Sequence, residues 1–255
     1  MPIEIVTVPC LSDNYAYLVH DGKSGATALV DAPEAAPILD ALAARGWTLE
    51  EVWITHHHAD HTQALNNILA QYPAKVRGAA ADAHRLPPLD TAHADEDRFD
   101  FGSEKVRVMD VSGHTIGHIA YYLADTGAVF TADSLMTLGC GRLFEGTADQ
   151  MWASLSKLIA LPPGTQVFSG HEYAAANAKF ALTIDPDNAD LKARAEAVAK
   201  AGAENLPTVP SSLAEEMATN PFLRAKDPAI RRILNKKEAT DAEVFAEIRA
   251  RKDVF

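Results

Sequence analysis

Short runs of apolar and β-branched residues occupy much of the first two thirds of the chain and predict strands. These runs cover residues 3–8, 15–20, 27–31, 52–54, 76–79, 106–111, 128–130 and 166–168. Helical spacing over residues 34–45 predicts a helix closed by Gly46, and another helix is expected over residues 62–71. Strands interleaved with helices in this way indicate a domain that mixes α and β elements.

The pattern changes after residue 171, where helical spacing replaces the strand-like runs. Helices are predicted over residues 172–182, 188–201, 212–218 and 241–252. Thr147, Ser212 and Thr240 each stand three residues before a Gln or Glu, which predicts capping boxes. We therefore predict an α+β domain over residues 1–173 and an all-α domain over residues 174–255. Residues 82–100, rich in acids and proline, are expected to form an exposed excursion.

Charge is distributed unevenly along the chain. The formal net charge is -12, which argues against a nucleic-acid surface, because such a surface needs clustered Lys and Arg. Residues 224–255 nevertheless carry about +3, counting their Lys and Arg against their Asp and Glu. A locally basic end on an acidic body favours a small anionic ligand over a polymer.

Compartment is inferred from what the sequence lacks. A basic leader with a long apolar run is absent from the start, and nowhere do about 18 apolar residues follow one another. The two cysteines, Cys10 and Cys140, are too few for a disulfide framework, and neither has a motif that would make it a nucleophile. We expect a cytoplasmic protein, monomeric and without nucleic-acid or membrane partners.

Four of the predicted strands end in a small or hydroxyl residue followed by a histidine or an aspartate. These ends are Thr55-His56, Ser112-Gly113-His114, Thr131-Ala132-Asp133 and Ser169-Gly170-His171. The first opens the stretch Thr-His-His-His-Ala-Asp-His over residues 55–61, which holds four imidazoles and a carboxylate. Small residues let the backbone turn sharply and approach an ion, and loops at strand ends commonly carry active sites. The pattern predicts a metal site.

Seven residues form the candidate ligand set. A catalytic tetrahedral ion usually takes three protein ligands and a water, so seven ligands suit two ions better than one. One ion is assigned His56, His58 and His114, the other Asp60, His61 and His171, and Asp133 bridges them. These ligands fit two divalent ions of zinc, iron or manganese, with zinc as the first expectation. Such a pair can lower the pKa of a bound water and supply hydroxide for hydrolysis, with Asp60 and Asp133 as catalytic carboxylates.

The remaining histidines are given other roles. His57 falls out of phase with its neighbours and is expected to face away or to support a ligand. His118 is expected to orient a ligand or to pack in the core. Three histidines without a surrounding motif are expected at the surface: His20, His84 and His93.

The histidine stretch, with Gly113-His114, Asp133 and His171, resembles the His-x-His-x-Asp-His signature of the metallo-β-lactamase superfamily. The resemblance covers about residues 1–172. It implies an αββα sandwich, two sheets packed face to face with helices outside, and the two-ion assignment given above. The superfamily cleaves lactams, thioesters, lactones and phosphodiesters, so membership alone does not fix the substrate.

Other segments make the chain similar to the glyoxalase II, or hydroxyacylglutathione hydrolase, family from end to end. They are Gly-Cys-Gly-Arg-Leu-Phe-Glu-Gly-Thr (139–147), His-Glu-Tyr (171–173), Asn-Pro-Phe-Leu-Arg (220–224) and Arg-Ala-Arg-Lys-Asp-Val-Phe (249–255). The resemblance implies hydrolysis of S-D-lactoylglutathione to D-lactate and glutathione, the second step of methylglyoxal detoxification. Two positions depart from the family: Ala132, where Gly is usual, and Phe144, where some members carry Tyr.

The same resemblance assigns substrate binding to Arg142, Phe144, Tyr173, Arg249 and Lys252. Glutathione carries two carboxylates, which Arg and Lys recognise. If residues 241–252 form a helix, Arg249 and Lys252 stand three apart on one face and can offer two cations to one glycyl carboxylate.

Three alternatives compete with the hydrolase. A mononuclear-iron persulfide dioxygenase of the same superfamily would use a subset of these ligands, but it does not explain the basic end. A metallo-phosphodiesterase is disfavoured by the acidic body, and a non-enzymatic binding module by the presence of every predicted ligand. Counting metal ions and measuring oxygen uptake separates the dioxygenase from the hydrolase.

Overall fold

The computed structural model describes residues 3–255, which form two compact units. The first unit runs up to Asp110 and resumes over Ile116–Thr131. The second unit consists of Val111–Thr115 and Ala132–Phe255. No helix among residues 3–255 is both long enough and apolar enough to span a bilayer.

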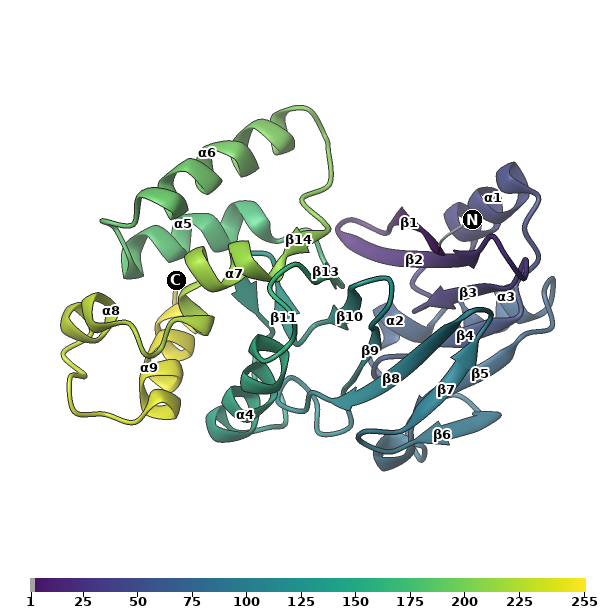
Figure 1. Ribbon diagram of the computed structural model, residues 1–255, viewed down its shortest axis with the longest axis horizontal. Coiled ribbons are helices and arrows are strands. Elements are labelled where there is room, and N and C mark those ends of the chain that lie inside the picture. The colour runs from purple at the N-terminus through teal and green to yellow at the C-terminus, as the bar shows by residue number, and fades with distance from the viewer. Residues whose placement is uncertain (1–2) are drawn as a thin grey trace. The chain divides into compact units, whose positions relative to one another are not determined.

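A six-stranded sheet with the order β1-β2-β3-β4-β5-β6 lies in the first unit (Figure 1). Its strands are β1 Ile3–Cys10, β2 Asn14–Asp21, β3 Thr27–Val30, β4 Glu51–Trp53, β5 Lys75–Ala79 and β6 Thr91–His93. Short turns join β1 to β2 and β2 to β3, so these pairs are antiparallel. Longer connections separate β3, β4, β5 and β6, which run parallel; helix α1, Ala35–Arg45, supplies the first of these crossovers.

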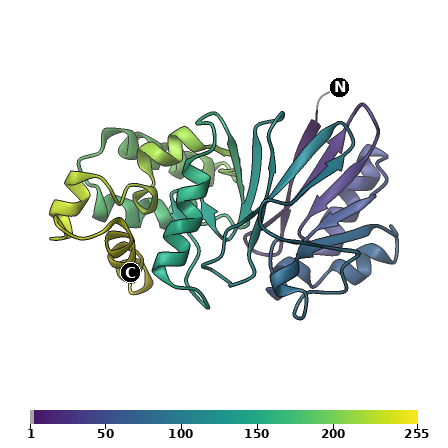
Figure 2. The ribbon, with the colours of Figure 1, turned by 60° about the horizontal axis from the view of Figure 1, so that its bottom comes forward.

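A second sheet of the first unit packs on the first. Four of its strands, antiparallel and in the order β10-β9-β8-β7, are β7 Arg98–Phe101, β8 Glu104–Asp110, β9 Ile119–Leu123 and β10 Ala128–Ala132. Figure 2 shows the two sheets as separate layers of strands. Trp53 of the first sheet meets Tyr121 and Phe101 of the second at ring-centroid distances of 5.4 and 5.0 Å. Burying a side chain of this kind contributes about 1.5–3 kcal/mol. The Tyr121 hydroxyl also donates to the Ile54 carbonyl at 3.0 Å, which ties the sheets together next to the histidine stretch.

The helical part of the histidine region differs from the prediction. Two short helices, α2 Ala59–Thr62 and α3 Leu65–Leu69, replace the single helix expected over residues 62–71. The Ala64 amide donates to the Ala32 carbonyl at 3.0 Å, and the Asp60 carbonyl accepts from the Asn14 amide at 3.1 Å. These tertiary bonds take the place of the helical bond from residue 64 to residue 60, so the helix divides there.

Residues 82–100 are mostly exposed, as expected, but β6 and β7 form within them. His93, expected at the surface, is buried and stacks on Phe99 at 5.0 Å. Burial, and then the nearby Arg77, lowers the pKa of His93. The prediction was wrong because pairing of β6 with β5, which no local pattern signals, carries His93 into the core. His84 is exposed, as expected.

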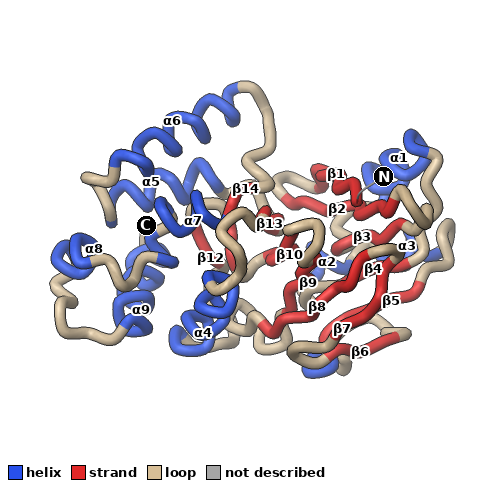
Figure 3. Tube along the Cα trace, in the orientation of Figure 1, coloured by secondary structure: helices blue, strands red, loops and turns tan. Residues whose placement is uncertain are grey.

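Helices dominate the second unit (Figure 3). They are α4 Ala148–Ile159, α5 Ala174–Ile184, α6 Ala189–Ala203, α7 Leu213–Thr219, α8 Pro228–Ile233 and α9 Asp241–Asp253, with short strands β11 Leu135–Met136, β12 Gly139–Cys140, β13 Gln166–Ser169 and β14 Ser211–Ser212. The capping boxes at Thr147 and Thr240 are confirmed, and Ser212 caps α7 by accepting from the Glu215 amide. No strand was expected after residue 171, but the short strand β14 lies beyond it and pairs with β13. Phe222 packs between Phe180 and Phe245 at 5.9 Å from each, forming an aromatic core.

Candidate active site

The histidine stretch follows β4 and continues into α2. His56 is fully buried, and its Nε2 lies 3.2 Å from Nδ1 of His58. Two imidazole nitrogens that approach so closely and face one another are suited to share a cation or a proton. Asp60 and His61 follow within α2, and His61 Nε2 lies 3.8 Å from Asp60 Oδ2.

Asp31 orients two of these histidines from the end of β3. Its Oδ2 accepts from the Thr55 hydroxyl at 2.8 Å and lies 2.8 Å from His61 Nδ1. Because the Thr55 hydrogen goes to Asp31, Thr55 Oγ1 accepts from His56 Nδ1, 3.0 Å away. Both rings therefore carry their hydrogen on Nδ1 and present the Nε2 lone pair, which is the form that binds metal. Ligand atoms of Asp31, His56 and His61 all lie within 4.8 Å of one another.

Sequence reasoning missed Asp31, although a signal was present. The run over residues 27–31 ends in an aspartate directly after Val30, as the other ligand-bearing strands end in His or Asp. Asp31 is also held at φ +57, a backbone conformation that Asp tolerates better than most residues. A further supporting residue is Asn14, whose amide donates to Asp60 Oδ2 at 3.0 Å.

The other two histidines of the region, His57 and His118, contact buried side chains. Nδ1 of His57 lies 2.9 Å from the buried carboxylate of Asp82. His118 is fully buried and stacks on His56, with ring centroids 4.5 Å apart and planes 14° from parallel. The expectation that His118 packs in the core is confirmed.

In the second unit, two histidines approach the same carboxylate oxygen of Asp133. His114 Nε2 lies 3.4 Å and His171 Nε2 lies 3.3 Å from the same oxygen, Asp133 Oδ2. All three residues are buried. The Gly170 amide donates to the Ala132 carbonyl at 2.9 Å, which aligns the strand ends that carry Asp133 and His171.

The glycine-punctuated loop over residues 139–146 sets the orientation of His114. The Arg142 carbonyl, which can only accept, lies 2.8 Å from His114 Nδ1, so in the neutral ring Nε2 presents a lone pair to Asp133. A lone pair and a carboxylate oxygen at this distance repel unless a cation lies between them, so the donor chemistry fits a divalent ion. Gly141 is required here, because an added Cβ would stand 2.0 Å from the Asp133 carbonyl oxygen.

Ala132, immediately before Asp133, is held at φ +40, where Gly is favoured. We expect Ala132→Gly to change the free energy of unfolding by less than about 0.5 kcal/mol, because relief of backbone strain offsets the lost methyl and the added freedom of the unfolded chain. Ala128→Gly, at the buried start of the same strand without a positive φ, is expected to cost about 1.5–2 kcal/mol. Urea unfolding of both variants checks this, and equal losses would rule out strain at Ala132.

Two aromatic side chains lie against the histidines of the second unit. Tyr173, 40% exposed, stacks on His171 with centroids 4.8 Å apart and planes 8° from parallel. Phe144, 61% exposed, presents its ring to His114 at 5.2 Å. Exposed aromatic rings beside candidate metal ligands are suited to bind the apolar part of a small ligand.

Three cations predicted to bind substrate all lie in the second unit. The Arg249 guanidinium is buried; it donates to the Cys140 carbonyl at 3.0 Å and lies over Phe222 at 5.1 Å. Arg142 is exposed on the glycine-punctuated loop. Lys252 Nζ donates to the Ala176 carbonyl at 3.3 Å, and burial, followed by the charge of Arg249, lowers the Lys252 pKa. Arg249 therefore has structural contacts that the sequence did not predict.

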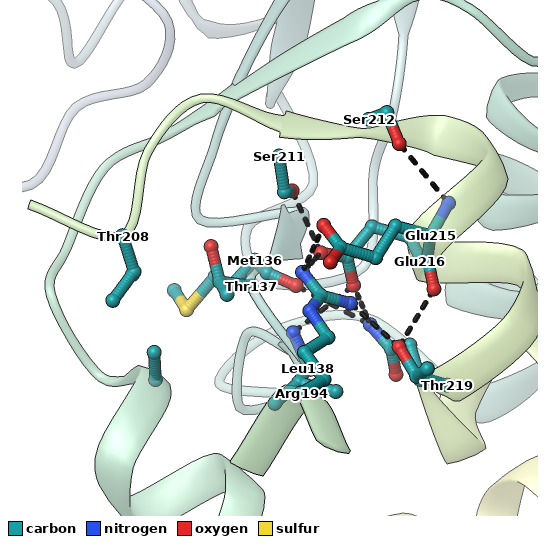
Figure 4. A network of polar contacts seen from close by, with 12 residues as sticks. Met136, Thr137, Leu138, Arg194, Thr208, Ser211, Ser212, Glu215, Glu216 and Thr219 are labelled. Carbon is teal, nitrogen blue, oxygen red and sulfur yellow. Dashed lines mark hydrogen bonds and ion pairs between the residues drawn. The ribbon is translucent and has the colours of Figure 1, made fainter. Parts of the chain in front are cut away.

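A buried polar network holds the segment between Asp133 and Arg142 (Figure 4). Glu216, fully buried, accepts from the Leu138 amide at 3.0 Å, from the Ser211 hydroxyl at 2.7 Å and from the Asn220 amide at 3.0 Å. Arg194 of α6 forms a buried ion pair with the same carboxylate. The network joins α6 and α7 to the β11–β12 turn, and sequence reasoning did not predict it.

Both cysteines are buried, and desolvation raises their pKa values. The pKa of Cys10 rises to about 12, with the charge of Glu34 adding to burial, and that of Cys140 rises to about 11. Neither thiol ionises near neutral pH, which agrees with the prediction that neither is a nucleophile.

Comparison with known proteins identifies the family. A family model described as "Metallo-beta-lactamase superfamily" matches residues 12–171, and one described as "Hydroxyacylglutathione hydrolase C-terminus" matches residues 172–255. The chain is 71% identical to a "Hydroxyacylglutathione hydrolase" of Roseobacter denitrificans and 65% identical to one of Ruegeria pomeroyi, over 100% of each chain in both cases. The predicted domain boundary at residues 173–174 stays a prediction.

Solved structures share the fold. BLEG-1 B3 metallo-beta-lactamase matches with a TM-score of 0.67 at 20% identity, over 86% of this chain and 99% of that chain. ETHE1 from Myxococcus xanthus matches with a TM-score of 0.65 at 25% identity, over 100% of this chain and 99% of that chain. The predicted combination of a metallo-β-lactamase fold with a helical C-terminal region is confirmed.

Proposed function

Because the chain belongs to the hydroxyacylglutathione hydrolase family of the metallo-β-lactamase superfamily, we propose that it hydrolyses the thioester bond of S-D-lactoylglutathione, giving D-lactate and glutathione. The observation that carries the proposal is the 71% identity to a curated hydroxyacylglutathione hydrolase over the whole of both chains. The matching C-terminal family model, over residues 172–255, covers the region that contains the cations Arg249 and Lys252.

The seven predicted ligands are proposed to hold two divalent cations, zinc first. His56 and His61 in the first unit, and His114 in the second, each have Nδ1 engaged by an oxygen atom, which leaves Nε2 for a metal. The Asp133 oxygen near both His114 and His171 suits a carboxylate shared between two ions. When bound, such cations lower the pKa of water and stabilise the negative charge that develops on the thioester carbonyl oxygen.

The protein's own groups are proposed to orient the attacking water and to accept its proton. Asp60 is the candidate acceptor, because Asn14 fixes its carboxylate through Oδ2 and its side chain is 43% exposed, within reach of solvent. The leaving group is the glutathione thiolate, whose ordinary pKa of about 8.5 makes it a good leaving group near neutral pH. A separate general acid is therefore unnecessary, and neither buried cysteine is needed as a nucleophile.

Substrate binding is proposed to use the cations and aromatic rings of the second unit. The carboxylates of glutathione require positive partners, and Lys252 is the candidate that has no ion pair with a carboxylate in residues 3–255. Tyr173 and Phe144 offer exposed rings beside His171 and His114. Arg142 and Arg249 complete the predicted set.

Lys252→Ala is expected to raise KM for S-D-lactoylglutathione by about 5–10-fold and to change kcat by less than about 2-fold, because it removes a charge that contacts substrate away from the reacting bond. Lys237→Ala, an exposed cation on the loop before α9, is the matched control and should leave both constants unchanged. An unchanged KM in the Lys252 variant would exclude Lys252 from the substrate site.

The activity itself is tested with the purified protein. Loss of thioester is followed with S-D-lactoylglutathione while oxygen consumption is recorded in the same vessel. The proposal predicts hydrolysis at the same rate in air and under argon. Oxygen uptake with a glutathione persulfide, and no loss of the thioester, would instead indicate the dioxygenase alternative.

A further inference from the structure

Asp253, in the last turn of α9, is shared by two arginines that lie far apart in the sequence. Its Oδ1 is 3.0 Å from Nη2 of Arg249, one turn earlier on the helix, and 3.3 Å from Nε of Arg142 on the glycine-punctuated loop. Arg142 and Asp253 are separated by 111 positions, so the fold, and not the helix alone, creates this pairing. Both arginines are members of the predicted substrate-binding set.

The position of Asp253 is unfavourable for a carboxylate by itself. The carbonyl end of a helix carries partial negative charge, so an anion in the last turn is destabilised. Basic residues are preferred in this turn, and Arg251 and Lys252 occupy it. The two guanidinium groups therefore offset the unfavourable interaction between the Asp253 carboxylate and the helix dipole.

The two arginines contribute unequally to the pairing. Arg249 is 6% exposed and is fixed by the Cys140 carbonyl and the Phe222 ring, so it cannot move away from Asp253 easily. The side chains of Arg142 and Asp253 are 56% and 36% exposed. Ion pairs with this exposure contribute little to stability, so a carboxylate from solution can replace Asp253 beside Arg142 at small cost.

We propose that Asp253 is an internal competitor for the substrate's carboxylate: it occupies the guanidinium groups of Arg142 and Arg249 in the free enzyme, and the glycyl carboxylate of the glutathione thioester displaces it. This inference rests on the proposed function. Its consequence is weaker binding of substrate and product than two unoccupied arginines would give. Asp253 thus sets affinity, and it favours release of glutathione after the thioester is cleaved.

The test replaces Asp253 with asparagine, which keeps the size of the side chain and removes its charge. Asp253→Asn is expected to lower both KM for S-D-lactoylglutathione and the inhibition constant of product glutathione by about 3–10-fold. Glu247→Gln is the matched control, because it removes one negative charge from the same helix where the carboxylate pairs with Arg251 at 2.9 Å. The control should leave both constants within about 2-fold of wild type.

A second ligand identifies the carboxylate that competes. Glutathione with its glycyl carboxylate converted to a carboxamide should inhibit wild type and Asp253→Asn equally, because it has no glycyl carboxylate that could displace Asp253. An increased KM in Asp253→Asn would mean that Asp253 orients the arginines for substrate and does not compete with it. Constants equal to those of Glu247→Gln would place Asp253 outside the binding site. Either result overturns the proposal.

Failure of the proposed function is distinguishable from failure of this inference. A wild-type chain that does not hydrolyse S-D-lactoylglutathione refutes the function. Calorimetric titration of the same three proteins with glutathione then still decides the role of Asp253. Tighter binding to Asp253→Asn than to wild type and Glu247→Gln supports the competition, and equal binding by all three contradicts it.

Discussion

Asp133→Asn is expected to lower kcat for S-D-lactoylglutathione by about 10²–10³-fold and to reduce bound divalent metal by about one ion per chain. The carboxamide has the size of the carboxylate but no charge. It therefore places a neutral oxygen or an NH₂ group at the position where His114 and His171 both approach Asp133 Oδ2, at 3.4 and 3.3 Å. Steady-state kinetics and elemental analysis of the purified variant measure the two effects.

Asp149→Asn provides the control for this experiment. Asp149 is exposed in the first turn of α4, so the same chemical change there should leave metal content and turnover at wild-type values. Far-UV circular dichroism of both variants establishes that the fold persists. Full metal content and normal turnover in the Asp133→Asn protein would show that Asp133 is not a metal ligand.

Glu216→Gln is expected to lower the free energy of unfolding by about 3–5 kcal/mol, the usual cost of leaving one partner of a buried ion pair without its counter-charge. Arg194 is 6% exposed and would keep its charge in the core. The new NH₂ group would also face the donors that Glu216 now accepts from, among them the Leu138 amide and the Ser211 hydroxyl. Urea unfolding at fixed metal concentration measures the loss.

The neighbouring residue makes a matched comparison. The Glu215 side chain is 48% exposed and lies 3.6 Å from Arg194, so Glu215→Gln should cost less than about 1 kcal/mol. The double variant Arg194→Met with Glu216→Gln should lose less than the sum of the two single losses, since neither charge is then buried alone. A Glu216→Gln protein as stable as the Glu215→Gln protein would show that the network contributes little.

Sequence patterns predicted the elements that carry the candidate site because those patterns are local. A strand followed by a small residue and a ligand, as at Gly113-His114 and Gly170-His171, lies within a few positions of the chain. Most helices of the second unit were predicted for the same reason, since caps such as Thr240 with Glu243 act over one turn. Helix α8 was not predicted. The superfamily and the C-terminal family were inferred from segments of this kind and are confirmed by the family models.

The residues that orient the ligands were harder to predict, because their partners are distant in the sequence. Asp31 reaches His61 across 30 positions, and the Arg142 carbonyl reaches His114 across 28. Arg249 was predicted only as a substrate contact, but its guanidinium also binds the Cys140 carbonyl, 109 positions away. Such contacts depend on how the elements pack, and apolar periodicity carries no information about them.

We propose that two divalent cations, held by the seven predicted histidine and aspartate ligands, drive the cleavage of the thioester. The most direct measurement titrates the metal-free protein with zinc and follows hydrolysis of S-D-lactoylglutathione at each addition. The account predicts that activity reaches its plateau at about two ions per chain, the number that seven ligands with one shared carboxylate suit. A plateau at one ion per chain, or thioester cleavage by the metal-free protein, would contradict it.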